Sequence, residues 1–169
     1  MEIALLTKSG LRIKGEQASV AIDPSDKAVY EAVLLLTKTP EEVTKQDETI
    51  LVTGAGEYEI GGIKVGCMRS ETDLVYSIIV DGVEVMVGKL TVLEKMQHKL
   101  KEHNIVVVNC DAEGSASFIT SLAENVVMFY GDKAKEITAS FGKENVKEMT
   151  KYSSTKDKLP TEVETVLLQ

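Results

Sequence analysis

The stretch AVLLLTKTPEEV, from Ala32 to Val43, contains the change of structure that organises this chain. Its first residues are consecutive and apolar, a pattern typical of a buried β-strand. The segment Thr39-Pro40-Glu41-Glu42 then supplies a capping threonine, a proline at the first helical position and a glutamate three residues after the cap. In α/β proteins, functional loops often lie at the carboxyl ends of strands. The stretch is therefore either such a loop or only the joint between a strand and a short helix ending near Gln46.

Composition narrows the class of protein. The chain has 169 residues, 43% of them hydrophobic, which is enough for one sizeable core, so we expect a single domain over residues 1–169. The formal charge is −8, from 27 acidic and 19 basic residues, and tryptophan is absent. Nucleic-acid binding needs concentrated positive charge and aromatic stacking platforms, so we expect no nucleic-acid partner.

The expected location is the cytoplasm. No apolar run approaches the 18 residues of a membrane-spanning helix, and the opening MEIALLTKSG lacks the apolar core of a signal peptide. The two cysteines, Cys67 and Cys110, form neither a disulfide framework nor a CxxC pair. Reduced thiols and no contact with a membrane are the resulting expectations.

Short strand-like runs bounded by turn signals fill the first half of the chain. They are Glu2 to Leu6, Leu11 to Lys14, Ser19 to Ile22, Glu31 to Thr37 and Thr49 to Thr53. Asp81-Gly82 is the strongest hairpin signal, and it separates the predicted strands Leu74 to Val80 and Val83 to Val87.

After Lys89 the apolar period changes from that of strands to that of helices. Apolar residues at helical spacing predict an amphipathic helix from Thr91 to His103. Further helices are predicted at Ser115 to Ala123 and Lys133 to Phe141, strands at Ile105 to Asn109 and Val126 to Tyr130, and a terminal hairpin from Val146 to Tyr152 and Glu162 to Leu168. This order favours the α/β class, as an αββα sandwich of two mixed sheets with helices outside.

Few residues suggest catalysis. The two histidines, His98 and His103, are five positions apart on the predicted helix, so they do not share a face as a metal-binding pair would. We expect His98 to face solvent and His103 to lie at the helix end. Cys110 follows a predicted buried strand, where sites occur, although a packed free thiol is the more ordinary interpretation.

Several segments together resemble the metallo-β-lactamase fold. MEIALLTKSGLRIKG followed by VAIDPSD, and GAGEYEIGGIKVGC at Gly54 to Cys67, are similar to the small single-domain Zn-dependent hydrolase branch, which includes the ascorbate-phosphate lactonase type. The central hairpin, the helix after it and the terminal LPTEVETVLL segment fall in the same order. The resemblance covers nearly the whole chain and implies an αββα sandwich.

The metal-ligand motifs of that branch are absent from the matching positions. Active members carry His-x-His-x-Asp-His after a buried strand ending in Thr, whereas this chain has Lys38 to Val43, where only Glu42 keeps a carboxylate. The bridging aspartate of the family matches Lys89, and its late histidine falls near Tyr130. Zinc requires imidazole, thiolate or carboxylate ligands, so the resemblance implies a degenerate member with no metal and no cofactor.

The emptied site still contains charged residues, and we hypothesise that its lysines replace the positive charge of the metal. Three matching positions hold lysine, while several carboxylates, with Glu59 as a further candidate, would face one another without countercharge. The alternative is an open pocket with solvated lysines. The candidate residues of this vestigial site, which is also a candidate anion-binding site, are Lys8, Asp23, Lys38, Glu42, Glu57, Lys89 and Tyr130.

Two functions follow from the resemblance. The first is a non-catalytic, metal-free protein that binds a protein partner or a second copy of itself, or helps to build an assembly. The alternative is a hydrolase-like enzyme whose altered site works without metal, or is completed by a partner, and acts on a small anionic substrate. A perturbed pKa in a cleft would favour the enzyme.

Overall fold

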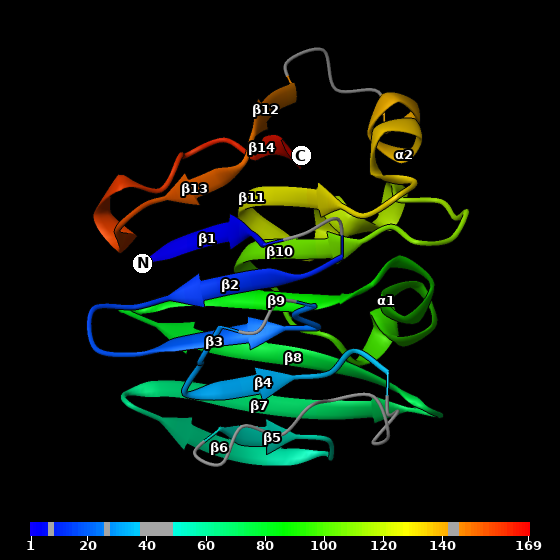
Figure 1. Cartoon of the computed structure of the whole chain (residues 1–169). Coiled ribbons are helices and arrows are strands. Elements are labelled where there is room, and N and C mark those ends of the chain that lie inside the picture. The colour runs from blue at the N-terminus through cyan, green and yellow to red at the C-terminus, as the bar shows by residue number, and fades with distance from the viewer. Residues whose placement is uncertain (7–8, 26–27, 38–48, 142–145) are drawn as a thin grey trace.

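The chain forms two stacked β-sheets, and the structure, a computed structural model, describes residues 1–6, 9–25, 28–37, 49–141 and 146–169 (Figure 1). One sheet consists, in these ranges, of β1 (Glu2–Leu5), β2 (Leu11–Lys14), β3 (Ser19–Ile22), β4 (Ala32–Leu34), β5 (Ile50–Val52) and β13 (Lys151–Ser153). Their spatial order is β13-β1-β2-β3-β4-β5. The pairs from β13 to β3 are antiparallel, whereas β3, β4 and β5 run parallel.

The second sheet is larger and also mixed. In the described residues it consists of β6 (Gly56–Ile60), β7 (Ile63–Ser70), β8 (Asp73–Val80), β9 (Val83–Lys89), β10 (His103–Asn109), β11 (Ala123–Tyr130), β12 (Val146–Met149) and β14 (Glu164–Leu168). Their order is β12-β14-β11-β10-β9-β8-β7-β6. β6 to β9 form an antiparallel meander, and β9, β10, β11, β14 and β12 are parallel. We call these the six-stranded and the eight-stranded sheet.

The predicted hairpin at Asp81-Gly82 is confirmed. Both residues have positive φ, 50° and 77°, which is the conformation that a two-residue turn between antiparallel strands requires. Because the turn fixes the register, alternate side chains of β8 point to opposite faces of the sheet. Tyr76 and Ile78 enter the core between the sheets, and Val75 packs on the outer face.

Two large apolar layers, together with a small cluster around Tyr30, stabilise the fold. The larger one lies between the sheets, with residues such as Ile13, Leu34 and Val107 fully buried. The other lies between the outer face of the eight-stranded sheet and α1 (Leu90–Met96), the 3-10 helix η2 (Ser117–Ser121) and α2 (Ala134–Ser140). Since β10 is covered on both faces, its sequence is almost continuously apolar instead of alternating.

Three sequence predictions need correction. The helix from Thr91 to His103 ends much earlier: α1 stops at Met96, a 3-10 turn η1 (Gln97–Lys99) follows, and His103 begins β10. The helix predicted from Ser115 is only the 3-10 segment η2. The terminal hairpin is wrong, because β12 runs parallel to β14 in one sheet while β13 pairs with β1 in the other.

The helix predicted after Thr39 lies outside the described residues. Within the described part of the chain, no helix combines the length and the apolar character needed to cross a lipid bilayer.

Candidate functional site

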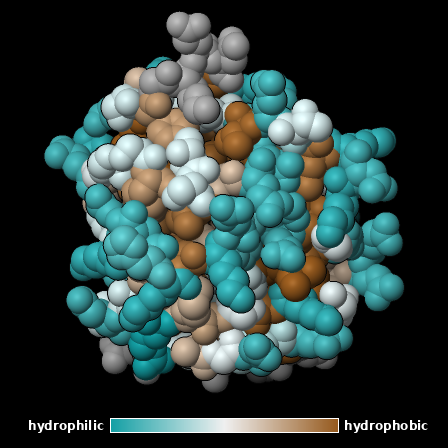
Figure 2. Space-filling view, turned by 180° about the vertical axis from the view of Figure 1, so that it is seen from behind, coloured by the Kyte–Doolittle hydropathy of each residue, from teal (hydrophilic) through white to brown (hydrophobic). Residues whose placement is uncertain are grey.

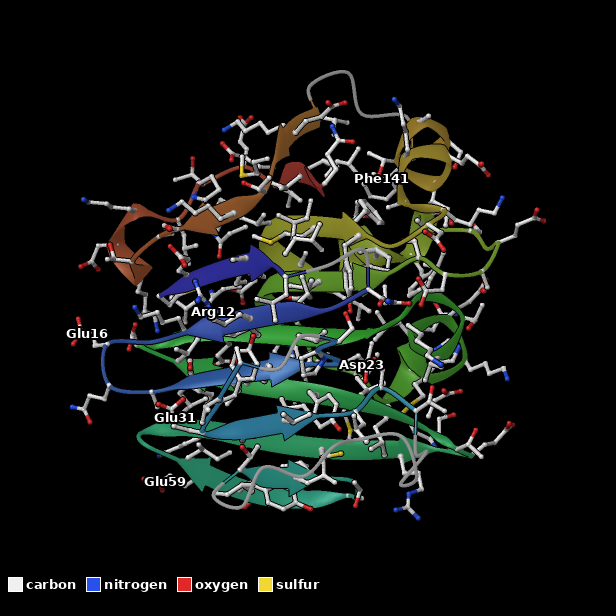
Figure 3. The ribbon with its side chains drawn as sticks, in the orientation of Figure 1. Arg12, Glu16, Asp23, Glu31, Glu59 and Phe141 are labelled. Carbon is white, nitrogen blue, oxygen red and sulfur yellow. The ribbon has the colours of Figure 1, made fainter. Side chains whose placement is uncertain are left out.

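Strands of both sheets end at the same edge of the sandwich (Figure 1). β3, β4, β9, β10 and β11 all reach this edge with their carboxyl ends, and Asp23, directly after β3, lies there (Figure 3). Carboxyl ends of neighbouring strands are where α/β folds gather functional side chains. We call the group formed there by Asp23, Thr37, Asp73, Lys89 and Tyr130 the strand-end cluster.

Lys89 links the two sheets within this cluster. Its ammonium donates to Asp73 Oδ1 at 2.9 Å and also to Thr37 Oγ1. Thr37 in turn donates from its hydroxyl to Asp73 Oδ1 at 2.9 Å, and an isolated backbone bridge joins the same two residues. Lys89 and Asp73 belong to the eight-stranded sheet, and Thr37 follows β4 of the six-stranded sheet. The network therefore holds the two sheets together at this edge.

The two carboxylates of the cluster have opposite pKa shifts. Burial raises the pKa of Asp23 to about 6, against the opposing effects of a hydrogen bond from the Leu36 N–H at 3.1 Å and of the Lys89 charge. Burial also raises the pKa of Asp73, but the hydrogen bonds from Lys89 and Thr37 and the positive charge of Lys89 outweigh it and leave the pKa lowered. Asp73 is thus the ionised partner of Lys89. The negative charge of Asp23 is less well compensated by nearby positive charge.

Asp23 has a φ of +43°, a left-handed conformation that aspartate tolerates better than most residues. This conformation bends the chain at the end of β3, and the carboxylate then caps the backbone N–H of Leu36 beyond β4. The backbone strain at Asp23 is tolerated because its carboxylate connects two parallel strands of the six-stranded sheet, β3 and β4.

Tyr130 forms the buried wall of the cluster. Its side chain is fully buried at the end of β11, beside Asn109 in the neighbouring strand. Burial raises the pKa of Tyr130 well above its ordinary value, and the nearby Asp23 charge raises it further, whereas the Asn109 side chain lowers it. Neither the Tyr130 hydroxyl nor Asn109 Oδ1 has a well-formed hydrogen bond among the described residues. Tyr130 is therefore a neutral phenol, not an anionic ligand.

The cysteine at this edge belongs to another layer. Cys110 follows β10, but its side chain is buried in the apolar layer under α1 and η2. Burial raises the pKa of Cys110 to about 12, with a further contribution from the adjacent Asp111. A thiol with so little thiolate is a poor nucleophile and a poor metal ligand.

The structure brings together only part of the predicted site. Asp23, Lys89 and Tyr130 meet in the strand-end cluster, while Lys8, Lys38 and Glu42 lie outside the described residues. Glu57 is not in the cluster: it is exposed on β6, where it lines a shallow depression on the outer face of the eight-stranded sheet. Glu59 lies on the same strand, far across the molecule from Asp23 (Figure 3). The expectation that these two glutamates face Asp23 is wrong.

Sequence reasoning missed Thr37 and Asp73. Both had a weak signal, since Thr37 ends a predicted strand and Asp73 precedes the predicted strand that pairs with the strand of Lys89. Nothing in their local sequence shows that they meet, because β4 and β8 belong to different sheets.

The residues present do not fit a dinuclear zinc centre. In the described ranges no three histidine, cysteine, aspartate or glutamate side chains are placed to bind one metal ion. The two histidines of the sequence are elsewhere, His98 exposed in η1 and His103 in β10. At the strand-end cluster an ammonium group is hydrogen-bonded to Asp73, and a protonated amine cannot bind a metal ion.

Comparison with known structures shows the fold. The chain is similar to a proposed zinc-dependent hydrolase of the metallo-β-lactamase superfamily from Thermotoga maritima, with a TM-score of 0.72, 12% sequence identity and coverage of 99% of this chain and 98% of that one. It is also similar to a proposed metal-dependent hydrolase from Parabacteroides distasonis, with a TM-score of 0.57, 15% identity and coverage of 99% and 93%. The chain therefore has the metallo-β-lactamase fold.

Sequence comparison gives no closer assignment. No family model matches the sequence, and neither does any curated protein. At such low identity to the solved structures, the likeness concerns the arrangement of strands and helices and not the chemistry.

Proposed function

We propose that the protein is a metal-free form of this fold that performs no zinc-dependent hydrolysis and acts as a binding or assembly component. The observation that carries the proposal is the position of Lys89. Its ammonium lies between Asp73 and Thr37 at the edge where the fold gathers its strand ends. The positive charge at this edge is thus supplied by a lysine side chain of the protein itself, not by a metal ion.

The electrostatics of the cluster agree with this role. A divalent cation would have to displace or approach the ammonium of Lys89, and like charges a few ångströms apart repel strongly in a partly buried site. Asp73 is only about a quarter exposed and already has its countercharge. A lysine in such a pair stabilises the folded state, whereas a zinc site would require Asp73 to be free for the metal.

A binding role also suits the surface charge. The net charge of −8 favours basic partners through long-range attraction, and both sheets have edge strands in the described residues, β5 and β6 among them. The partner in this proposal is another protein or a second copy of the chain, in the cytoplasm, and the strand-end cluster holds the two sheets in register for that surface.

The decisive experiment measures zinc binding and hydrolysis by the purified full chain. After incubation with excess zinc and removal of free metal, elemental analysis should find far less than one zinc per chain, and zinc-dependent ester or lactone hydrolysis should be absent. The variant Lys89→Met removes the ammonium and should also remain metal-free, because the remaining ligands are too few. Lys133→Met, at the residue directly before α2, is the matched control. Stoichiometric zinc in the wild-type chain would refute the proposal.

The binding part of the proposal has its own measurement. Native mass spectrometry and size-exclusion chromatography at several concentrations should show either a dimer or, after purification under mild conditions, a defined complex with another protein. A chain that stays monomeric and emerges without any stoichiometric partner would refute a role in assembly.

A further inference from the structure

His103 and Ser77 form a hydrogen-bonded pair that lies away from the strand-end cluster. Ser77 Oγ and His103 Nε2 are 2.6 Å apart, and His103 Nδ1 lies 2.9 Å from the backbone carbonyl oxygen of Lys101. A carbonyl oxygen can only accept, so Nδ1 carries a proton. In the neutral imidazole Nε2 is then the acceptor, and Ser77 donates its hydroxyl proton to it.

The strand geometry explains how the two side chains meet. Ile105 and Val107 of β10 point into the core between the sheets, so simple alternation would send His103 the same way. The pairing of β10 with β11 shifts between His103 and Ile105. Such irregularities re-aim side chains, and here the imidazole reaches Ser77 on the outer face of the eight-stranded sheet. We call Ser77 and His103 the outer-face pair.

The serine is accessible while the histidine is protected. Ser77 is half-buried and lines a shallow depression of about 520 Å³, whereas His103 is only 5% exposed. Gly66 stands directly opposite Ser77 in β7, and a Cβ added there would lie 3.8 Å from Ser77 Cβ, so the absence of a side chain leaves space beside the serine. Figure 2 shows hydrophilic and hydrophobic groups mixed over the back of the molecule.

The charges beside Ser77 complete the arrangement. Lys64 lines the depression and stands diagonally from Ser77 across β7 and β8, within reach for a long side chain. Its ammonium can stabilise a developing oxyanion. Glu57 and Glu59 line the same depression, so an anionic substrate would be repelled. The depression suits a neutral or cationic molecule.

From this geometry we propose that the outer-face pair is an acyl-accepting site for small neutral or cationic carboxylic esters. Ser77 Oγ attacks the ester carbonyl carbon while its proton passes to His103 Nε2. When the carbon–oxygen bond to the alcohol breaks, the alcohol leaves with that proton, and an acyl-serine remains. Water then attacks the acyl-serine with the same proton transfers, which releases the acid and restores the pair. Lys101 positions the imidazole through its carbonyl oxygen.

This inference goes beyond the proposed function, because it concerns another face of the molecule and needs no metal. Zinc bound at the strand-end cluster would refute the proposed function and leave the outer-face pair unaffected. A Ser77 that does not react would refute the present inference and leave the proposed function unaffected.

The test is covalent labelling of the full chain with a fluorophosphonate, followed by peptide mapping. Ser77 should lose its proton to His103 and displace fluoride, with labelling roughly 100-fold faster than at Ser121. Ser121 is a matched control, since it is exposed and its hydroxyl donates to the Phe118 carbonyl instead of to a base. The substitution His103→Gln should abolish the labelling of Ser77, and 4-nitrophenyl acetate should be cleaved faster than its anionic succinate analogue.

A second measurement covers the case in which the variant does not fold. In the wild-type chain, 4-nitrophenyl acetate should leave an acetyl group on Ser77, detected by mass spectrometry of the intact chain and then by peptide mapping. Ser77 labelling no faster than Ser121, labelling that survives in folded His103→Gln, or acetyl groups found at other serines instead of at Ser77 would each overturn the proposal.

Discussion

The strand-end cluster and the outer-face pair use polar groups in opposite ways. The cluster connects the two sheets through charged groups, with Lys89 bound to Asp73 and to Thr37 of the other sheet. The outer-face pair lies within one sheet, is held by neutral hydrogen bonds and opens onto a depression. The first arrangement depends for stability on the ion pair between Lys89 and Asp73. The second can lose the Ser77 hydroxyl at small energetic cost, so its geometry is better suited to chemistry than to holding the fold together.

The largest expected effect is charge reversal in the cluster. Lys89→Asp would place a third carboxylate beside Asp73 and Asp23, and we expect a loss of about 2–4 kcal/mol in the free energy of unfolding at about pH 7.5. The measurement is guanidinium denaturation. Lys133→Asp is the control, because Lys133 pairs with the exposed Glu136, and it should cost about 1 kcal/mol or less. Equal losses for the two variants would show that the cluster has no special role.

A second cross-sheet contact extends the comparison. Tyr76 is fully buried in β8, and its hydroxyl donates to the backbone carbonyl oxygen of Leu35 at 2.6 Å. Leu35 follows β4 in the other sheet. Tyr76→Phe should cost about 1–2 kcal/mol, because it leaves a buried carbonyl without its partner. Tyr58→Phe is the control: this half-buried hydroxyl bonds locally to Gly54, and its loss should cost less. Thermal unfolding of both variants measures the difference, and a larger loss for Tyr58→Phe would contradict it.

The pH dependence of stability distinguishes the two carboxylates of the cluster. The folded pKa of Asp23, about 6, is above its ordinary value of 3.8, so the unfolded chain ionises first as the pH rises. Stability therefore falls between about pH 4 and pH 6, and the loss persists at higher pH. Asp23→Asn keeps an acceptor for Leu36 and removes the ionisation, so it should be about 1–3 kcal/mol more stable than wild type at about pH 8.

Asp73→Asn should show the opposite behaviour. The pKa of Asp73 is lowered in the folded state, so its contribution to stability is present above the ordinary pKa and disappears as the pH falls through the folded value. This variant should be less stable than wild type at about pH 8, and the difference should vanish in acid. If both asparagine variants shift stability in the same direction, the assignment of Asp73 as the ionised partner of Lys89 is wrong.

The smallest expected effect belongs to the outer-face pair. Ser77→Ala removes one neutral hydrogen bond near the surface and should cost about 1 kcal/mol or less, as measured by urea denaturation. Because the loss is small, folded protein will be available for the labelling and esterase measurements. A loss larger than that of Tyr76→Phe would mean that the pair is mainly a structural contact.

Local signals predicted the parts of the fold that depend on neighbouring residues. Asp81-Gly82 predicts its hairpin because a two-residue turn needs residues that tolerate positive φ. The buried strands from Ile105 and from Val126 follow from continuous apolar runs. The resemblance to the metallo-β-lactamase fold then supplied the sandwich of two mixed sheets.

Which strands pair with each other, and where certain side chains point, could not be predicted from local sequence in the same way. The residues of β12 and β13 are adjacent in sequence, yet their strands pair in different sheets, because pairing is decided by long-range contacts. His103 continues a helical apolar period, but Leu100 ends η1 in an extended conformation and the chain enters β10. Asp73 and Thr37 meet only because two sheets stack. Each of these features depends on tertiary structure that local patterns do not contain.

The separation of β12 from β13 also has a consequence for the order of folding. β1 pairs with β13, so the partner of a strand that begins at Glu2 is made only when Lys151–Ser153 have been synthesised. Until then one edge of the nascent six-stranded sheet lacks this partner, and unpaired edges invite association between chains. Long-range pairing of this kind also slows folding. During synthesis, the edge beside β1 is therefore a place where unfinished chains can associate.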